Sequence, residues 1–75
     1  MSEEFCIIDG RDLLPPEPMV RTLDALNELP QGRALTLLLY REPFPLYEVL
    51  KAKGYQHHTQ LQRDGTYHIR IWRAS

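Results

Sequence analysis

Hydrophobic and polar positions along the chain predict six short elements. The apolar run at residues 5–8 predicts a strand, and leucines at helical spacing predict a helix over about residues 17–29. Residues 34–40 are apolar at almost every position, as in a central strand that is covered on at least one side. A second helical stripe over residues 46–50 ends at Gly54, and the alternating segments 55–63 and 66–73 predict a hairpin.

The register of this hairpin follows from the residues that must share its buried face. A two-residue turn at 64–65 would place Gln60 on the same face as Ile69. A three-residue loop at 63–65, with Gly65 in the left-handed conformation of a bulge, shifts the pairing by one residue. Because register follows the buried face, we predict the bulged loop. One face then holds Leu61, Thr59, His57, Tyr67, Ile69 and Ile71.

The order strand, helix, strand, helix, strand, strand predicts an α+β fold. The simplest arrangement is a two-layer βαβαββ sandwich, in which two helices pack on one face of a four-stranded mixed sheet. We expect residues 1–75 to form a single domain, because a chain of this length has no room for a second core.

The composition indicates the cellular compartment of the protein. One cysteine in 75 residues excludes an intramolecular disulfide and favours a reduced, cytoplasmic compartment. No apolar run reaches the roughly 18 residues of a membrane span, and residues 1–4 lack the positive start of a signal peptide. We therefore expect a cytoplasmic protein with no membrane partner.

The net charge of −1 conceals an uneven distribution along the chain. Residues 1–50 carry four arginines against nine acidic residues, a net charge of −5, whereas residues 51–75 carry a net charge of +4. The basic hairpin presents a basic and aromatic set that could stack bases, which makes RNA binding one alternative function. The low total charge argues against nucleic acid as the partner. The residues of this alternative face are Arg63, His68, Arg70 and Trp72.

The segment DGRDLLPPEP at residues 9–18, together with the helix that follows it, resembles the TusA/SirA-like group of small bacterial proteins. Members of that group have a βαβαββ fold and a Cys-Pro-x-Pro motif at the start of the first helix. In the sulfur carriers among them, the motif cysteine bears a persulfide. Pro16 and Pro18 match the two motif prolines, and Pro15 occupies the cysteine position.

The chain is more similar to a cysteine-less branch of that group, classed as a domain of unknown function. Its members share the PPEP motif, a Pro-x-Pro-Leu-Tyr segment (here residues 43–47) and a Gly-Tyr or Gly-Phe pair (here Gly54 and Tyr55). The resemblance covers roughly residues 5–72. That branch has no established reaction, and some members are linked with genes for hemerythrin-like proteins or nitrogen-oxide metabolism.

The missing cysteine bears directly on the function. A persulfide carrier needs a thiolate that a helix N-terminus stabilises, and Pro15 offers neither a thiol nor an N–H group. Cys6 lies nine residues upstream in an apolar strand, where cysteines act as small hydrophobic residues. These features argue against sulfur transfer, and an atypical sulfur carrier that uses Cys6 is the alternative function. Enzyme motifs are absent, and His57 and His58 point to opposite faces of a strand, so we predict no catalytic residue, metal or cofactor.

The sequence thus favours a non-catalytic, TusA-like interaction or accessory module with a protein partner. By resemblance, this role connects with redox or nitrogen-oxide metabolism. The proline-rich segment also has a purely structural interpretation, because prolines at a helix start stiffen the preceding loop. The candidate contact residues lie at the starts of the two helices: Arg11, Pro15, Pro16, Glu17, Pro18, Phe44 and Tyr47.

Overall fold

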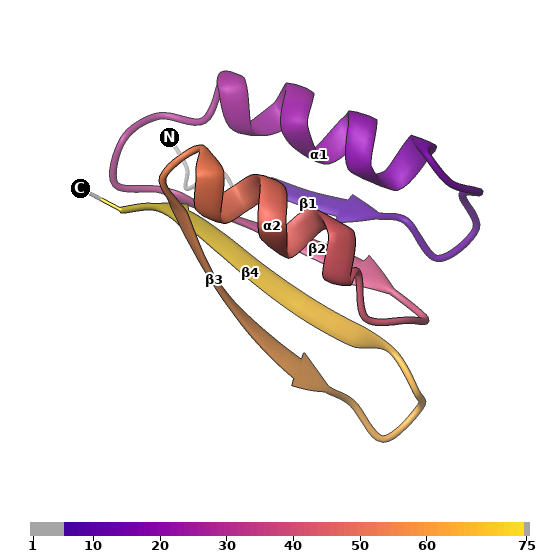
Figure 1. The fold of residues 1–75 in the computed structure, drawn as a ribbon. Helices are drawn as coiled ribbons and strands as arrows, with labels where there is room; N and C mark the ends of the chain where they lie inside the picture. The colour runs from indigo at the N-terminus through magenta and orange to yellow at the C-terminus, as the bar shows by residue number, and fades with distance from the viewer. Residues whose placement is uncertain (1–5, 75) are drawn as a thin grey trace.

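The computed structural model describes residues 6–74 and contains the six predicted elements in the predicted order. Figure 1 shows the ribbon. The predicted strand at residues 5–8 includes Phe5, and the argument about a signal peptide uses residues 1–4. These residues lie outside the described part of the chain. In chain order the elements are β1 (Cys6–Asp9), α1 (Glu17–Asn27), β2 (Ala34–Leu39), α2 (Phe44–Ala52), β3 (Tyr55–Leu61) and β4 (Tyr67–Arg73).

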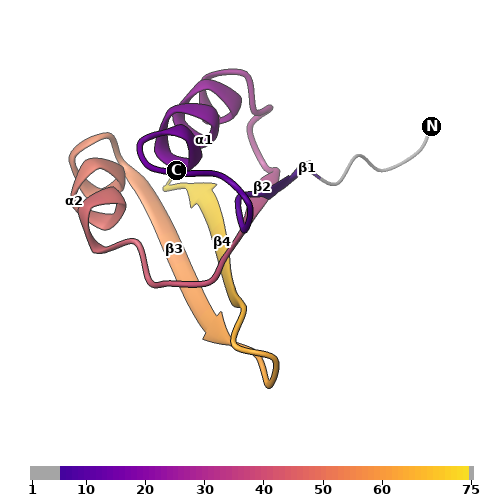
Figure 2. The ribbon, with the colours of Figure 1, turned by 90° about the vertical axis from the view of Figure 1, so that its right-hand side faces the viewer.

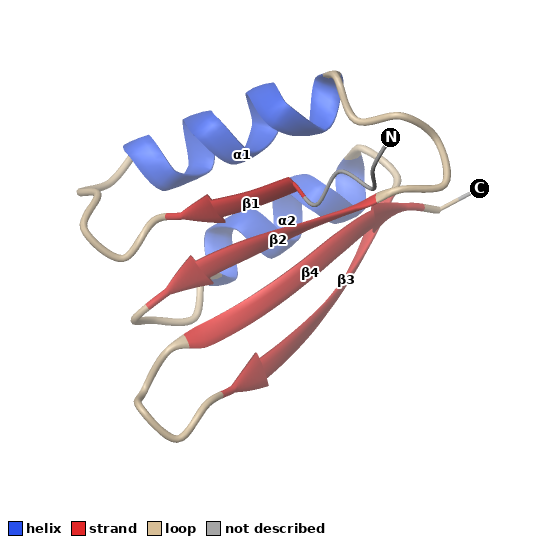
Figure 3. Cartoon of the chain, turned by 180° about the vertical axis from the view of Figure 1, so that it is seen from behind, coloured by secondary structure: helices blue, strands red, loops and turns tan. Residues whose placement is uncertain are grey.

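The four strands form one mixed sheet in the order β1-β2-β4-β3. β1 pairs with β2 in parallel, and the other two pairings are antiparallel. Both helices lie on the same face of this sheet (Figure 2). The opposite face, seen in Figure 3, carries no helix, and we call it the open face. The α+β sandwich predicted from the sequence is therefore confirmed.

The core lies between the sheet and the two helices. In β2 every second residue (Leu35, Leu37 and Leu39) is buried, whereas the alternate residues on the open face are half-buried. β2 is thus fully covered on its helix side and only partly covered on the other side. Around these leucines pack core residues from both helices and from β4: Leu26, Leu46, Leu50, Ile69 and Ile71.

The hairpin has the register that the sequence predicted. Thr59 pairs with Ile69, and the backbone N–H of Gln62 donates to the carbonyl of Thr66 at 2.8 Å, which closes a three-residue loop. Gly65 has a φ of +89°, the left-handed conformation that the bulge requires. Gln60 accordingly faces away from Ile69, on the open face.

The first helix differs from its prediction in two respects. It ends at Asn27 rather than at residue 29, and the apolar residue Val20 is 48% exposed. The buried residues of this helix are Leu26 and the polar Thr22, which lies about 200° around the helix from Val20. The Thr22 hydroxyl has no hydrogen-bond partner within the described part of the chain.

The topology brings the starts of both helices to one end of the molecule. Because β1 and β2 are parallel, the loops that leave them, residues 10–16 and 40–43, emerge on the same side. The hairpin loop at residues 62–66 lies there too, since Leu39 pairs with Tyr67 and Tyr67 with Leu61. We call these three loops, with the residues next to them, the helix-start end; it is at the right in Figure 1 and faces the viewer in Figure 2.

Candidate functional site

The proline-rich segment forms an exposed corner at the helix-start end. Pro15, Pro16 and Glu17 are exposed and Pro18 is half-buried. The peptide bond between Pro15 and Pro16 is cis. Pro16 caps α1 without a side-chain hydrogen bond, and the N–H of Glu17 donates to the carbonyl of Leu14 at 2.9 Å. Four of the predicted contact residues therefore lie together on the surface, with no thiol among them.

Arg11 lies beside this corner, but Asp9 already neutralises its charge. The guanidinium donates through Nε and Nη2 to the two carboxylate oxygens of Asp9, each at 2.8 Å, and the Arg11 backbone N–H adds a third bond at 3.1 Å. These bonds lower the pKa of Asp9 to about 2 and raise the pKa of Arg11. The pair stiffens the loop after β1 and leaves little net charge for a partner to recognise.

Tyr47 connects α2 to the sheet instead of facing solvent. Its hydroxyl donates to Oε2 of Glu42 at 3.0 Å and shares a hydrogen bond with Thr59. Its ring stacks on His57, with centroids 4.0 Å apart and planes 9° from parallel. Burial raises the pKa of Tyr47. The sequence predicted Tyr47 as a contact residue, whereas the structure assigns its polar group and one ring face to internal contacts.

Phe44 is the exposed aromatic residue at the start of α2. Its side chain is 64% exposed and meets the Tyr47 ring only edge-on, with centroids 5.8 Å apart. Three further large hydrophobic residues are exposed by 60–78% at the same end, in the loop before α1, just after β2 and at the last position of β3: Leu14, Tyr40 and Leu61. Together with Phe44, they place four exposed large hydrophobic side chains at the helix-start end.

Sequence reasoning missed these three residues because each had a plausible internal role. Tyr40 completes the apolar run of β2, and Leu61 alternates with the inner face of β3. In the structure Tyr40 lies one residue beyond β2, and Leu61 is the last residue of β3. A usable signal was Leu14, which precedes the helix and has no place in its apolar stripe.

Cys6 does not approach the motif position. It is the first residue of β1, whereas the motif loop follows the last residue of that strand. Its register partner is Leu35, so its side chain belongs to the helix-covered face, where it is half-buried against the core. The position of Cys6 is that of a small packing residue rather than of a thiol at a helix start.

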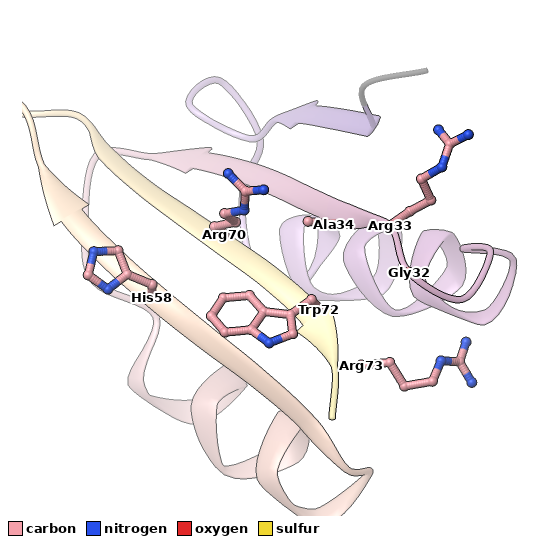
Figure 4. A pocket seen from close by; sticks show the side chains of 7 residues that line it. All are labelled: Gly32, Arg33, Ala34, His58, Arg70, Trp72 and Arg73. Carbon is pink, nitrogen blue, oxygen red and sulfur yellow. The ribbon is translucent and has the colours of Figure 1, made fainter. Parts of the chain in front are cut away.

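The open face carries a second candidate region, away from the helix-start end. Near the start of β2 the surface forms a shallow hollow of about 540 Å³ (Figure 4). Three of the four residues that the sequence proposed for base stacking lie on this face: His68, Arg70 and Trp72. Arg63 is separated from them in the hairpin loop. The hollow is lined by Gly32, Arg33, Ala34, His58, Arg70, Trp72 and Arg73.

The histidines are arranged as the register predicts. His57 lies on the helix-covered side against Tyr47, and His58 pairs with Arg70 on the open face. His68 also lies on the open face, beside Gln60. Within residues 6–74 no three His, Cys, Asp or Glu side chains come together as metal ligands.

Comparison with known proteins gives a family and a fold. The profile of a family described as uncharacterized conserved protein (DUF2249) matches residues 7–73. The crystal structure of a SirA-like protein from Desulfitobacterium hafniense matches with a TM-score of 0.80 over 89% of this chain and 95% of that chain. At 24% sequence identity, that likeness establishes the shared fold. No curated protein matches the chain. Among the described residues, no helix has the length and apolar character needed to cross a membrane.

Proposed function

The chain belongs to the DUF2249 family of uncharacterized conserved proteins, and from this premise we propose that it is a non-catalytic protein-interaction module with a SirA-like fold. The contact surface is the helix-start end. The observation that carries this proposal is the gathering of exposed apolar side chains there. Four of the six large hydrophobic residues that are exposed among the described residues lie at this end: Leu14, Tyr40, Phe44 and Leu61.

Burial of these side chains supplies the driving force for association. Full burial of one Leu or Phe side chain is worth about 1.5–3 kcal/mol, and a partner that covers several of them gains that amount repeatedly. Single exposed hydrophobic residues are ordinary, but a group of them at one end is typical of a binding surface. Apolar and aromatic anchors of this kind dominate the energetics of known interfaces.

Internal bonds hold the scaffold around these anchors. The Asp9–Arg11 pair braces the loop after β1, and Tyr47 ties the start of α2 to Thr59 on β3. A surface whose loops are already ordered loses less conformational entropy when it binds. Arg11 and Tyr47 therefore act as supports, whereas Pro15, Pro16 and Phe44 make the contact.

The test is site-specific photo-crosslinking in extracts of the native cell. A crosslinking phenylalanine analogue replaces Phe44 in one variant and the exposed Lys53, at the other end of α2, in the matched control. We expect one protein to be captured from position 44 and not from position 53, and to bind the purified chain. Equal capture from both positions, or a captured protein that fails to bind the purified chain, would contradict the proposal.

The sulfur-carrier alternative has a separate test. We expect Cys6 to gain no mass on incubation with a cysteine desulfurase and cysteine, because its side chain is packed against the core. Mass spectrometry of the intact protein measures this directly. A gain of about 32 Da, one sulfur atom as a persulfide, would make the protein a carrier and overturn the non-catalytic assignment.

A further inference from the structure

We propose that the hollow on the open face is a binding site for a free nucleotide, a planar heteroaromatic ring that carries a phosphate. This site is distinct from the helix-start end and does not depend on the function proposed for that end. The hollow lies beside the start of β2 and the end of β4, whereas the helix-start end lies where β2 finishes and β4 begins. Its volume of about 540 Å³ is within the range of small-molecule sites.

Trp72 supplies an aromatic surface for the ring. It is half-buried on β4 between Ala34 of β2 and Gln56 of β3, which are its cross-strand neighbours. The small side chain of Ala34 leaves the space beside the indole open, and Figure 4 shows the indole lying across the sheet near His58. An accessible indole in a shallow hollow is suited to stacking on a flat heterocycle.

Arg70 supplies a cationic group whose charge has no counterpart in the described structure. Its cross-strand neighbours are Thr36 and His58, so neither adjacent strand opposes it with a carboxylate. No hydrogen bond or ion pair of its guanidinium is found within residues 6–74. A guanidinium in this position can bind a phosphate through two parallel N–H···O bonds.

The rest of the lining strengthens the preference for an anion. Arg33 and Arg73 also line the hollow, and within residues 6–74 no acidic residue does. The Arg73 guanidinium is directed away from the hollow, because its Nη2 donates to the carbonyl of Leu29 at 3.3 Å and it lies 5.6 Å from the centroid of the Tyr55 ring, on the helix-covered side. On the same face, the carboxylate of Asp9 is already bound by Arg11. The cationic group that faces the hollow is therefore Arg70, and no described acidic side chain in the lining offsets its charge.

The charge of the whole chain favours a small ligand over a nucleic-acid strand. A long polyanion would extend beyond the hollow toward a protein whose first 50 residues have a net charge of −5. A single nucleotide places one phosphate at Arg70 and one ring at Trp72. Both contacts fit within the hollow, so the affinity for a nucleotide depends on the charge of Arg70 rather than on the charge of the whole chain.

Trp72 is the only tryptophan of the chain, so its fluorescence and its indole N–H resonance report on the hollow. The probes are adenosine 5′-monophosphate, adenosine, ribose 5-phosphate and a short single-stranded oligoadenylate. We expect saturable changes with the monophosphate and much weaker changes with adenosine or ribose 5-phosphate. No saturation with the monophosphate at millimolar concentration, or equal binding of either fragment, would overturn the proposal. Tighter binding of the oligonucleotide than of the monophosphate would overturn the assignment to a free nucleotide.

Two matched arginine variants locate the phosphate. We expect Arg70→Gln to weaken the monophosphate about tenfold to a hundredfold, the loss expected from a charge-assisted hydrogen bond. Arg63→Gln removes the same charge from the exposed hairpin loop and should leave the affinity unchanged. Amide spectra of both variants check that the fold is intact. Equal losses in the two variants would reduce the effect to nonspecific charge and contradict the site.

Discussion

The helix-start end and the hollow on the open face differ in almost every property that governs recognition. The helix-start end exposes apolar side chains such as Leu14 and Phe44, and the charged pair beside it, Asp9 and Arg11, is mutually neutralised. The hollow combines the Trp72 indole with the guanidinium of Arg70, and among the described residues no acidic side chain lines it. One surface gains free energy by excluding water, and the other by attracting an anion.

This difference follows from the topology of the fold. The parallel pairing of β1 and β2 collects both helix starts and the hairpin loop at one end. The antiparallel β4 then carries the basic C-terminal part of the chain back along the open face to the other end. Arg70 and Trp72 therefore lie on a different part of the molecule from the exposed apolar residues of the helix-start end.

Removal of the apolar anchors should produce the largest effect. The double variant Leu14→Ala and Phe44→Ala is expected to weaken the captured partner about a hundredfold, because anchor residues of this type carry most of the energy of an interface. Both side chains are exposed, so the free energy of unfolding should change by no more than about 0.5 kcal/mol. Titration calorimetry and chemical denaturation measure the two quantities.

The control for this variant is Ile7→Ala, which truncates an equally exposed side chain on the open face of β1. It should bind the partner as the unmodified chain does. If Ile7→Ala weakens the partner as much as the double variant does, the contact is not confined to the helix-start end, and the comparison between the two regions fails.

A higher salt concentration should weaken binding at the hollow more than binding at the helix-start end, and this difference should be smaller than the effect of the double variant. Between about 0.1 M and 1 M salt the Debye length falls from roughly 10 Å to 3 Å, which screens the Arg70 guanidinium in the hollow. Monophosphate binding should weaken several-fold over this range, while partner binding changes less than twofold. Salt-independent binding at the hollow would show that charge does not hold the ligand there.

The sequence was most informative wherever one residue type fixes the geometry. Gly65 and the apolar alternation around it determined the hairpin register, and Gly54 marked the end of α2. The two candidate regions were less accessible, because they depend on which distant elements meet. Sequence alone placed Tyr47 with Phe44 as contact residues, and only the packing of α2 on β3 shows that the hydroxyl of Tyr47 is used internally.

A change inside the core should affect neither surface. Thr22→Val replaces a buried hydroxyl that has no partner in the described residues with a methyl group of similar size. The free energy of unfolding should rise by about 1 kcal/mol, because an unpaired hydroxyl is costly to bury. Urea denaturation measures the change. A loss of stability would mean that the hydroxyl is hydrogen-bonded, and altered binding at either surface would show that the two surfaces are coupled through α1.

Acid should produce the smallest effect, at the loop beside the helix-start end. The pKa of Asp9 is about 2 in the folded chain, below the value of about 3.9 for an unfolded aspartate. Its contribution to stability is therefore complete above about pH 4 and is lost as the pH falls toward 2. Asp9→Asn should lower stability slightly at pH 6, and the difference should shrink as the pH falls toward 2, where about half of the folded chains carry a protonated Asp9. A difference as large near pH 2 as at pH 6 would exclude the ion pair as its cause.

The most direct test of the central claim is hydrogen exchange of the chain with and without the partner captured from position 44. If the helix-start end is the contact surface, amides in residues 10–16 and 40–47 exchange more slowly in the complex. Amides near the hollow, at residues 33–36 and 68–72, should be unchanged. Protection confined to the hollow would contradict the account, because the partner would then bind the open face.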